Sequence, residues 1–199
     1  IGSGYFNYLE GVATDSKSNV YLTGHFLSPD NDIVFYDTDT IVKGNPGYEG
    51  YTYKDYVVKL SPDGQFRWYK NNGGSDFFAY NAIAIDKNDE VVAAGGATSP
   101  VCFDSAVLNN QQGVYLAKYD TAGNTKWYKI FNTGRFANIQ HLTTDAGNNI
   151  IVGGIYKNSF IDMGNGVSAE SLYNAQYFAA KTDADGRPAW VANIPIYVG

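Results

Sequence analysis

The 199-residue chain is predicted to be an all-β protein made of three copies of one repeat. Its composition is the first observation: 17 Tyr and 22 Gly are typical of aromatic-rich strands separated by turns. A block that runs from an aspartate to a glycine is the second observation, and it occurs three times. A block with a fixed spacing of lysine, glycine and tryptophan follows each copy and is the third.

In the first block, a glycine follows an aspartate by nine residues. The copies are Asp15–Gly24, Asp86–Gly95 and Asp145–Gly154. Each aspartate is predicted to end a strand and to accept hydrogen bonds from the amides of the following turn. The strand after the turn is apolar at consecutive positions, as in Val91–Ala94. A strand exposed on one face would alternate with polar residues, so this run predicts a strand that is covered on both faces.

In the second block, glycine follows lysine by five residues and tryptophan follows that glycine by four. The recurring lysines and tryptophans are Lys59, Lys118, Lys181, Trp68, Trp127 and Trp190. All three tryptophans of the chain occupy this position. Each lysine is expected to lay its stem along the sheet and to pair with the recurring aspartate. Each tryptophan is expected to pack between neighbouring repeats.

Each repeat contains four predicted strands, which in the first copy are Tyr8–Thr14, Val20–Phe26, Tyr53–Leu60 and Gln65–Lys70. Radially packed four-stranded sheets cover every strand on both faces, so the predicted fold is a β-propeller with three four-stranded antiparallel blades. The blades are assigned to residues 1–71, with a long insert at 27–54, and to residues 72–130 and 131–199. Because propellers have about four to eight blades, we expect a larger ring, closed by further blades of the same longer chain or by a second copy.

The pattern formed by Ile83–Asp86, Val91–Gly95 and Leu116–Trp127 resembles the bacterial β-propeller repeat of the SBBP family. Gly73–Asp76 is similar to that family's link between blades, which is reduced to Thr133–Gly134 in the third repeat. The resemblance implies an extracellular or cell-surface protein, of a kind often exported by type IX secretion. It implies no common enzymatic activity, so we expect a non-catalytic module for protein contact or adhesion.

Charge and composition argue against several classes of function. The net charge is −6 and the basic residues are scattered, which disfavours a nucleic-acid partner. No apolar run is long enough for a membrane span. The single cysteine, Cys102, forms no intrachain disulfide and is expected to be a small buried residue. His25 and His141 occupy different repeat positions, so we expect both to be inert.

The insert of the first repeat is the candidate binding loop, because functional groups concentrate on loops set on a rigid scaffold. Its candidate residues are Asp30, Asp32, Tyr36, Asp37, Asp39, Tyr48 and Tyr51. They suit sugars, peptides or calcium, or a hairpin that packs on itself. Asp183 and Asp185 are similar to the start of a calcium loop, although the aligned turns lack both acids. Calcium is the one possible cofactor, and no catalytic residue is assigned.

Two alternatives to the non-catalytic module stay open. A carbohydrate-binding or polysaccharide-processing propeller would use a surface glycan as its partner, and it needs an aromatic and acidic face. A quinoprotein-type enzyme is the second, because a tryptophan after a glycine turn is also similar to quinoprotein repeats. The sequence lacks the cofactor-binding cluster of those enzymes.

Overall fold

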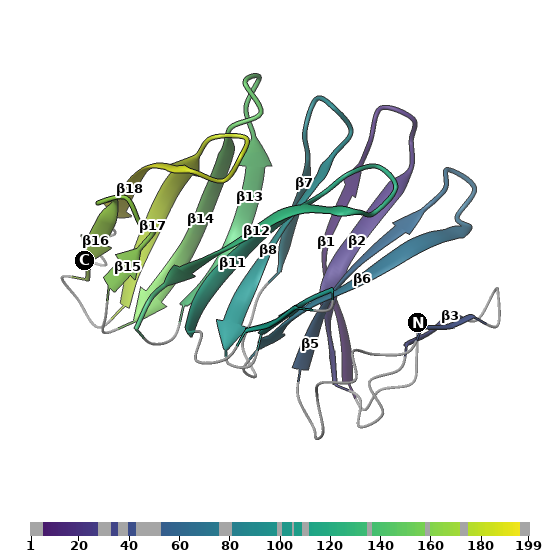
Figure 1. The fold of residues 1–199 in the computed structure, drawn as a ribbon, viewed down its shortest axis with the longest axis horizontal. Helices are drawn as coiled ribbons and strands as arrows, with labels where there is room; N and C mark the ends of the chain where they lie inside the picture. Colours follow the sequence, from purple (N-terminus) through teal and green to yellow (C-terminus); the bar gives the residue numbers. More distant parts are fainter. Residues whose placement is uncertain are drawn as a thin grey trace.

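The computed structural model describes residues 6–27, 33–35, 40–42, 53–75, 81–98, 101–104, 106–108, 112–134, 137–157, 160–171 and 175–195. All regular structure in these ranges is strand, and the strands pair antiparallel, which confirms the all-β prediction. No helix among these residues is long and apolar enough to cross a membrane. Figure 1 shows the sheets standing side by side along the molecule.

Each repeat forms an antiparallel meander of four long strands. The first repeat contains β1 (Phe6–Thr14), β2 (Val20–Leu27), β5 (Tyr53–Leu60) and β6 (Phe66–Ser75). The second contains β7 (Ala82–Ile85), β8 (Val91–Thr98), β11 (Gln112–Tyr119) and β12 (Thr125–Asn132). The third contains β13 (Ala137–Thr144), β14 (Ile150–Lys157), β17 (Ala175–Thr182) and β18 (Pro188–Ile194). Strands β6 and β12 run past the repeat boundaries predicted at residues 71 and 130.

The inserts between the second and third strands correct the prediction of three four-stranded sheets. In the second repeat the insert forms the hairpin β9 (Val101–Phe103) and β10 (Ala106–Leu108), which pairs with β6 of the first repeat. In the third repeat β15 (Phe160–Asp162) and β16 (Ser168–Glu170) pair with β12 in the same way. The first two sheets therefore have six strands and the third has four. The hairpins are held there because an outer strand presents unpaired backbone groups.

The insert of the first repeat contains the corresponding hairpin, β3 (Ile33–Phe35) and β4 (Thr40–Val42). It forms a two-stranded sheet by itself and pairs with no other strand that the structure describes. The corresponding hairpins β9–β10 and β15–β16 each extend the sheet of the preceding repeat. The hairpin β3–β4 has the same form but extends no sheet among the described residues.

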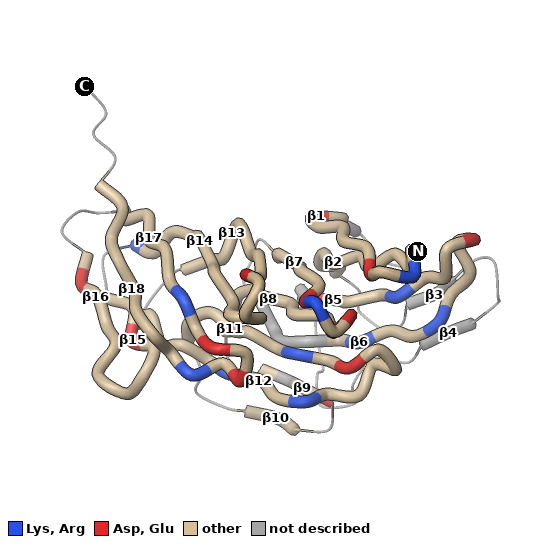
Figure 2. Tube along the Cα trace, turned by 90° about the horizontal axis from the view of Figure 1, so that it is seen from above, with Lys and Arg blue, Asp and Glu red and all other residues tan. Residues whose placement is uncertain are grey.

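Two apolar cores lie between the repeats, one at each joint. Tyr21 and Val57 of the first repeat pack with Ile83 and Tyr115 of the second. The other core joins the second repeat to the third. Alternate residues of the run Val91–Ala94 face the two cores, which explains why the run is apolar at consecutive positions. Seen from above, β1, β7 and β13 lie along one side and the sheets spread away from them as a fan (Figure 2).

Candidate functional site

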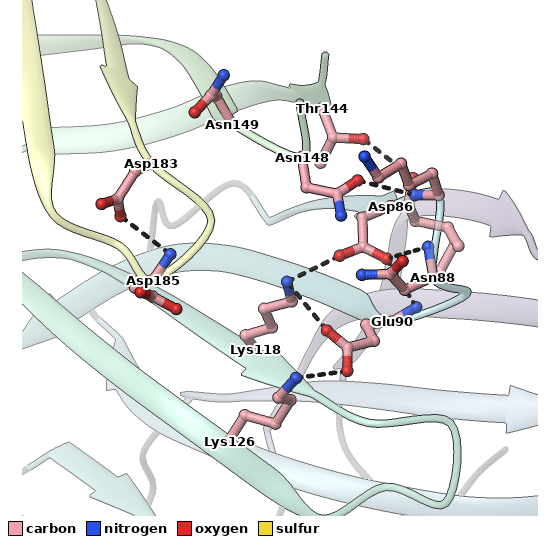
Figure 3. Close-up of polar contacts among 12 residues, drawn as sticks. Asp86, Asn88, Glu90, Lys118, Lys126, Thr144, Asn148, Asn149, Asp183 and Asp185 are labelled. Atoms are coloured by element: carbon pink, nitrogen blue, oxygen red, sulfur yellow. Dashed lines mark hydrogen bonds and ion pairs between the residues drawn. The ribbon is translucent and has the colours of Figure 1, made fainter. Parts of the chain in front are cut away.

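The recurring aspartate and lysine form an ion pair in every repeat. Lys118 Nζ lies 2.7 Å from Asp86 Oδ2 and 3.0 Å from a carboxylate oxygen of Glu90 (Figure 3). The other carboxylate oxygen of Asp86 accepts the amides of Asn88 and Glu90. Burial alone lowers the pKa of Lys118, but the hydrogen bonds to Asp86 and Glu90 outweigh burial and raise it. Asp86, Glu90 and Lys118 therefore hold the turn after β7 against strand β11.

The equivalent pairs differ in geometry. Lys181 Nζ lies 2.8 Å from Asp145 Oδ2, whereas Lys59 Nζ lies 3.7 Å from Asp15 Oδ2. Lys59 instead donates a hydrogen bond of 2.9 Å to the carbonyl of Thr121 in the second repeat. In the first repeat, the recurring lysine therefore also links two neighbouring repeats.

Each covered tryptophan lies under the glycine turn of the next repeat. A Cβ atom added to Gly123 would be 2.9 Å from the Trp68 ring, and one added to Gly186 would be 3.0 Å from the Trp127 ring. Both turns need glycine for two reasons: φ is 87° at Gly123 and 75° at Gly186, and the indole leaves no room for a side chain. The Trp68 indole also donates a hydrogen bond to the Thr121 carbonyl of the covering turn. We call this arrangement the tryptophan–glycine joint.

A second contact links the turns that follow the recurring aspartates. Ser16 donates hydrogen bonds from its amide and its hydroxyl to the Asp89 carboxylate, at 2.8 and 2.6 Å. One repeat later, the Lys87 amide donates to Asn148 Oδ1 at 3.2 Å. In both cases the second residue of one turn binds the fourth residue of the next turn. These hydrogen bonds join the turns of neighbouring repeats.

The open side of the third repeat exposes residues whose counterparts are covered. Tyr177, Trp190 and Ile194 are between 39% and 43% exposed. In the second repeat the residues at the positions of Tyr177 and Ile194 are Val114 and Phe131, and both are buried. Trp190 therefore differs from the packing role expected for it, because no turn covers it within the described chain. We call these three residues the trailing face.

The outer side of the first repeat is partly covered: Phe26, Tyr56 and Val58 are buried in a cluster of their own, whereas residues of β1 are exposed. Leu9 and Val12 of β1 are 62% and 65% exposed, whereas Ile139 and Ile83 at these positions in later repeats are buried. Gly64 occupies the place of Gly123 and has the same left-handed backbone, with φ of 85°. Nothing described lies within 4 Å of a Cβ atom added to it. We call Leu9, Val12 and Gly64 the leading face.

A buried polar cluster lies at the joint between the first and second repeats. His25 Nδ1 lies 3.2 Å from Glu10 Oε2, and the same oxygen accepts hydrogen bonds from the backbone and side-chain nitrogens of Asn81. Asn81 Nδ2 also donates to Asp55 Oδ1 at 3.1 Å. His25 therefore takes part in a polar network within the protein.

Asp55 is the most perturbed acid of the cluster. Burial raises its pKa to about 7, and the hydrogen bond from Asn81 and the nearby His25 only partly oppose that shift. Asp55 Oδ2 and Asn81 Oδ1 lie 2.6 and 2.2 Å from the point where Gly95 would carry a Cβ atom. The two oxygens therefore leave no room for a side chain at Gly95.

This cluster does not follow from the repeat pattern of the sequence, because its members do not recur. The position of Asp55 holds Val114 in the second repeat and Tyr177 in the third. A charged residue at an otherwise uncharged strand position is the signal that could have found it, because a buried charge requires a polar partner.

The candidate binding residues of the first insert lie outside the described residues. They are Asp30, Asp32, Tyr36, Asp37, Asp39, Tyr48 and Tyr51. The side chain of Cys102 lies outside them too, although its backbone forms part of β9.

The candidate calcium residues have partners within the protein. Arg187 Nη1 lies 3.6 Å from an Asp183 carboxylate oxygen and 3.2 Å from an Asp185 carboxylate oxygen. Asp183 also accepts the amides of Asp185 and Arg187. Across the part of the chain that the structure describes, no group of three or more His, Cys, Asp or Glu residues is arranged to hold a metal ion.

The chain is similar to an uncharacterized WD repeat-containing protein of Acanthamoeba polyphaga mimivirus. The two are 26% identical over 227 aligned positions, which cover 96% of this chain and 16% of the relative. The chain thus spans about a sixth of that protein's length. No family model matches the chain. WD repeats are propeller repeats, so the similarity supports a β-propeller repeat and leaves the SBBP type without support of its own.

Proposed function

We propose that this chain is a non-catalytic β-propeller segment that binds protein partners. The observation that carries the proposal is that the recurring residues of each repeat hold the scaffold together, whereas the inserts vary. The recurring Asp and Lys side chains are engaged in turns and ion pairs, and the tryptophans of the first two repeats pack in joints. Variation in length falls in the inserts, and two of these form hairpins on the outer edge of the preceding sheet. A rigid scaffold with variable surface segments is how binding proteins diversify their partners.

The WD repeat relative supports the same function, since a propeller of this kind presents a rigid surface to other proteins. The proposed setting is a protein that is secreted or held at a cell surface, where the module mediates contact or adhesion. That setting rests on the resemblance of the Lys–Gly–Trp block and the Gly-rich link to SBBP repeats.

A pocket on one insert favours a second candidate function, the binding of a surface glycan. The pocket has a volume of about 340 Å³ and lies on the β15–β16 hairpin. Phe160 lines it together with Asp162, Asn165, Ser168 and Glu170. An aromatic ring beside acidic and amide groups suits a sugar, because the ring packs on the apolar face of the sugar while the polar groups bind hydroxyls.

Binding measurements on the purified chain separate the two functions. The immobilised chain is offered proteins released from the surface of cells that make it and, separately, an array of polysaccharides. For a protein-binding module, we expect a retained protein whose affinity falls about tenfold when Phe160→Ala and Glu170→Lys are combined. Lys17→Ala is the control, because Lys17 is exposed on the turn after β1 and does not line the pocket.

Retention of a polysaccharide with the same dependence on Phe160 would favour the glycan function instead. Turnover of any bound polysaccharide would overturn the non-catalytic proposal.

A further inference from the structure

We propose that the outward face of the β15–β16 hairpin binds an extended, arginine-containing segment of a protein partner. Four exposed side chains form this surface, which we call the hairpin face: Phe160, Asp162, Ser168 and Glu170. The inference rests on the proposed function, because it names the chemistry of the protein that the module binds.

The hairpin is fixed to the scaffold, so the hairpin face has a defined shape. Ile161 and Met163 are buried in the core between the second and third repeats. Strand β15 pairs with β12, and the side-chain amide of Asn193 in β18 donates a hydrogen bond of 2.8 Å to the Glu170 carbonyl. A site that is held by packing and hydrogen bonds needs little ordering when a partner binds.

Strand pairing places an aromatic ring beside a carboxylate. Phe160 lies directly opposite Glu170, and Asp162 lies directly opposite Ser168. Opposite residues of an antiparallel pair have Cβ atoms about 4.5–5.5 Å apart. The Phe160 side chain is 36% exposed and lines the hollow of about 340 Å³ together with the three polar side chains. An arginine suits such a pair, because its guanidinium stacks on an aromatic ring while its N–H groups bind a carboxylate.

The two carboxylates of the hairpin face form no ion pair with a basic residue in the part of the chain that the structure describes. The other described hairpin of this kind differs, because Asp104 in the β9–β10 turn lies 2.7 Å from Lys70. The whole chain has a net charge of −6. Negative charge that the protein leaves uncompensated at one site favours a cationic partner and disfavours an acidic one.

The spacing along the hairpin indicates the form of the partner segment. On each strand the two residues of the hairpin face are separated by one residue. Alternate residues of an extended chain lie on the same side, about 6–7 Å apart. A segment with two arginines separated by one residue therefore places one guanidinium between Phe160 and Glu170 and the other beside Asp162.

The chemistry of the hairpin face favours this segment over a sugar. Sugar hydroxyls both donate and accept hydrogen bonds, whereas ionised carboxylates only accept them. The face is also particular to the third repeat. The corresponding position of the β9–β10 hairpin holds Cys102 between two buried residues, just as Asp162 lies between two buried residues. The acid is therefore a property of one insert and not of the repeat.

A peptide titration followed by NMR tests the inference. The nitrogen-15-labelled chain is titrated with a serine–glycine peptide that carries two arginines separated by one residue. We expect amide shifts that concentrate on residues 160–170. The affinity should be weak and should fall as salt is added, because exposed ion pairs contribute little and are screened. The same peptide with glutamates in place of the arginines is expected to cause no shifts there.

Three variants of the hairpin face identify the groups that bind. Glu170→Gln, Asp162→Asn and Phe160→Leu are each expected to weaken peptide binding about three- to fivefold. Asn keeps an oxygen that can accept the Gly164 amide, as Asp162 does, so this change removes the charge and preserves the turn. Asp63→Asn is the matched control, because it removes a charge from an exposed turn of the first repeat. The control is expected to bind as the unaltered chain does.

Several results would overturn the inference. They are shifts that lie outside the hairpin, equal binding of the glutamate peptide, and an affinity that none of the three variants changes. An uncharged oligosaccharide that shifts the same amides more strongly than the arginine peptide would overturn it in favour of a glycan. The proposed function fails by a different result, namely that the immobilised chain retains no cell-surface protein. A protein retained through another surface would leave that function standing while the inference fails.

Discussion

The second and third repeats carry the same ion pair in different surroundings. The Lys118 and Asp86 side chains are 4% and 0% exposed, whereas those of Lys181 and Asp145 are 29% and 33% exposed. The distances from Nζ to the carboxylate are nearly equal, at 2.7 and 2.8 Å. The recurring residues therefore form the same ion pair in both repeats, but the ion pair is buried only where a further repeat follows among the described residues. We expect this burial to determine how much the ion pair contributes to stability.

The largest expected effect is at Lys118. Lys118→Ala leaves the Asp86 carboxylate buried without its cation, which typically costs about 3–5 kcal/mol. Lys181→Ala is the matched change in the third repeat, and it should cost much less, because water solvates the remaining charge. Urea unfolding of both variants measures the difference. Equal losses would show that burial by the neighbouring repeat does not control the contribution of this pair.

The tryptophans are expected to follow the same order. Trp127→Ala removes a ring that packs under Gly186 and against the core, so we expect a loss of about 3 kcal/mol. Trp190→Ala should have a much smaller effect on unfolding, because the ring is 43% exposed. A loss below about 1 kcal/mol for Trp127→Ala would contradict its packing role.

Asp55 and Asp145 have pKa shifts of opposite sign, so the two acids should affect the stability of the fold in opposite ways as the pH changes. The folded-state pKa of Asp55 is about 7, above the usual 3.8, so ionisation opposes folding. Its contribution is full below pH 4 and is lost as the pH rises to about 7. Between pH 5 and pH 8 we expect a loss of roughly 2–3 kcal/mol, which Asp55→Asn should remove.

Asp145 should behave in the opposite sense. Its hydrogen bond with Lys181 lowers its pKa below 3.8, so its contribution is present above that pH and is lost on acidification. Denaturant melts from pH 3 to pH 8 on the unaltered chain and on Asp55→Asn measure the Asp55 contribution. A variant that keeps the full loss of stability between pH 5 and pH 8 would contradict its assignment to Asp55.

The smallest expected effect concerns the link between turns. Asp89→Gly removes the acceptor for Ser16 and keeps a residue suited to a φ of 62°. Ser18→Gly is the matched change at the same turn position in the first repeat, where no turn among the described residues binds the side chain. Thermal melts should show the Asp89→Gly variant to be less stable than the Ser18→Gly variant. Equal midpoints would mean that the exposed link contributes nothing measurable.

The strand scaffold could be predicted because each of its requirements is repeated. Asp86, Lys118 and Trp127 recur with their spacing because each acts in a contact that every repeat needs. Two features could not be predicted in this way. The Asp55 cluster occurs at one joint only, and the pairing of Phe103 with Asn72 joins segments whose sequences carry no reciprocal signal. Backbone pairing at a sheet edge depends on where the edge lies, which the sequence of the hairpin does not specify.

Because the hairpins β9–β10 and β15–β16 pair with the sheet of the preceding repeat, the repeating unit of the sequence differs from the sheet as a structural unit. The segment that repeats in the sequence begins near β7 and ends near β12, but the sheet completed by β9 and β10 begins at β1. A gene duplication that copies the sequence repeat therefore adds a hairpin that extends the sheet of the preceding repeat. It adds no hairpin that extends the sheet of the new repeat. Shortening the array at the end of β6 would uncover that strand's edge, whereas a chain that continues through β10 keeps it paired.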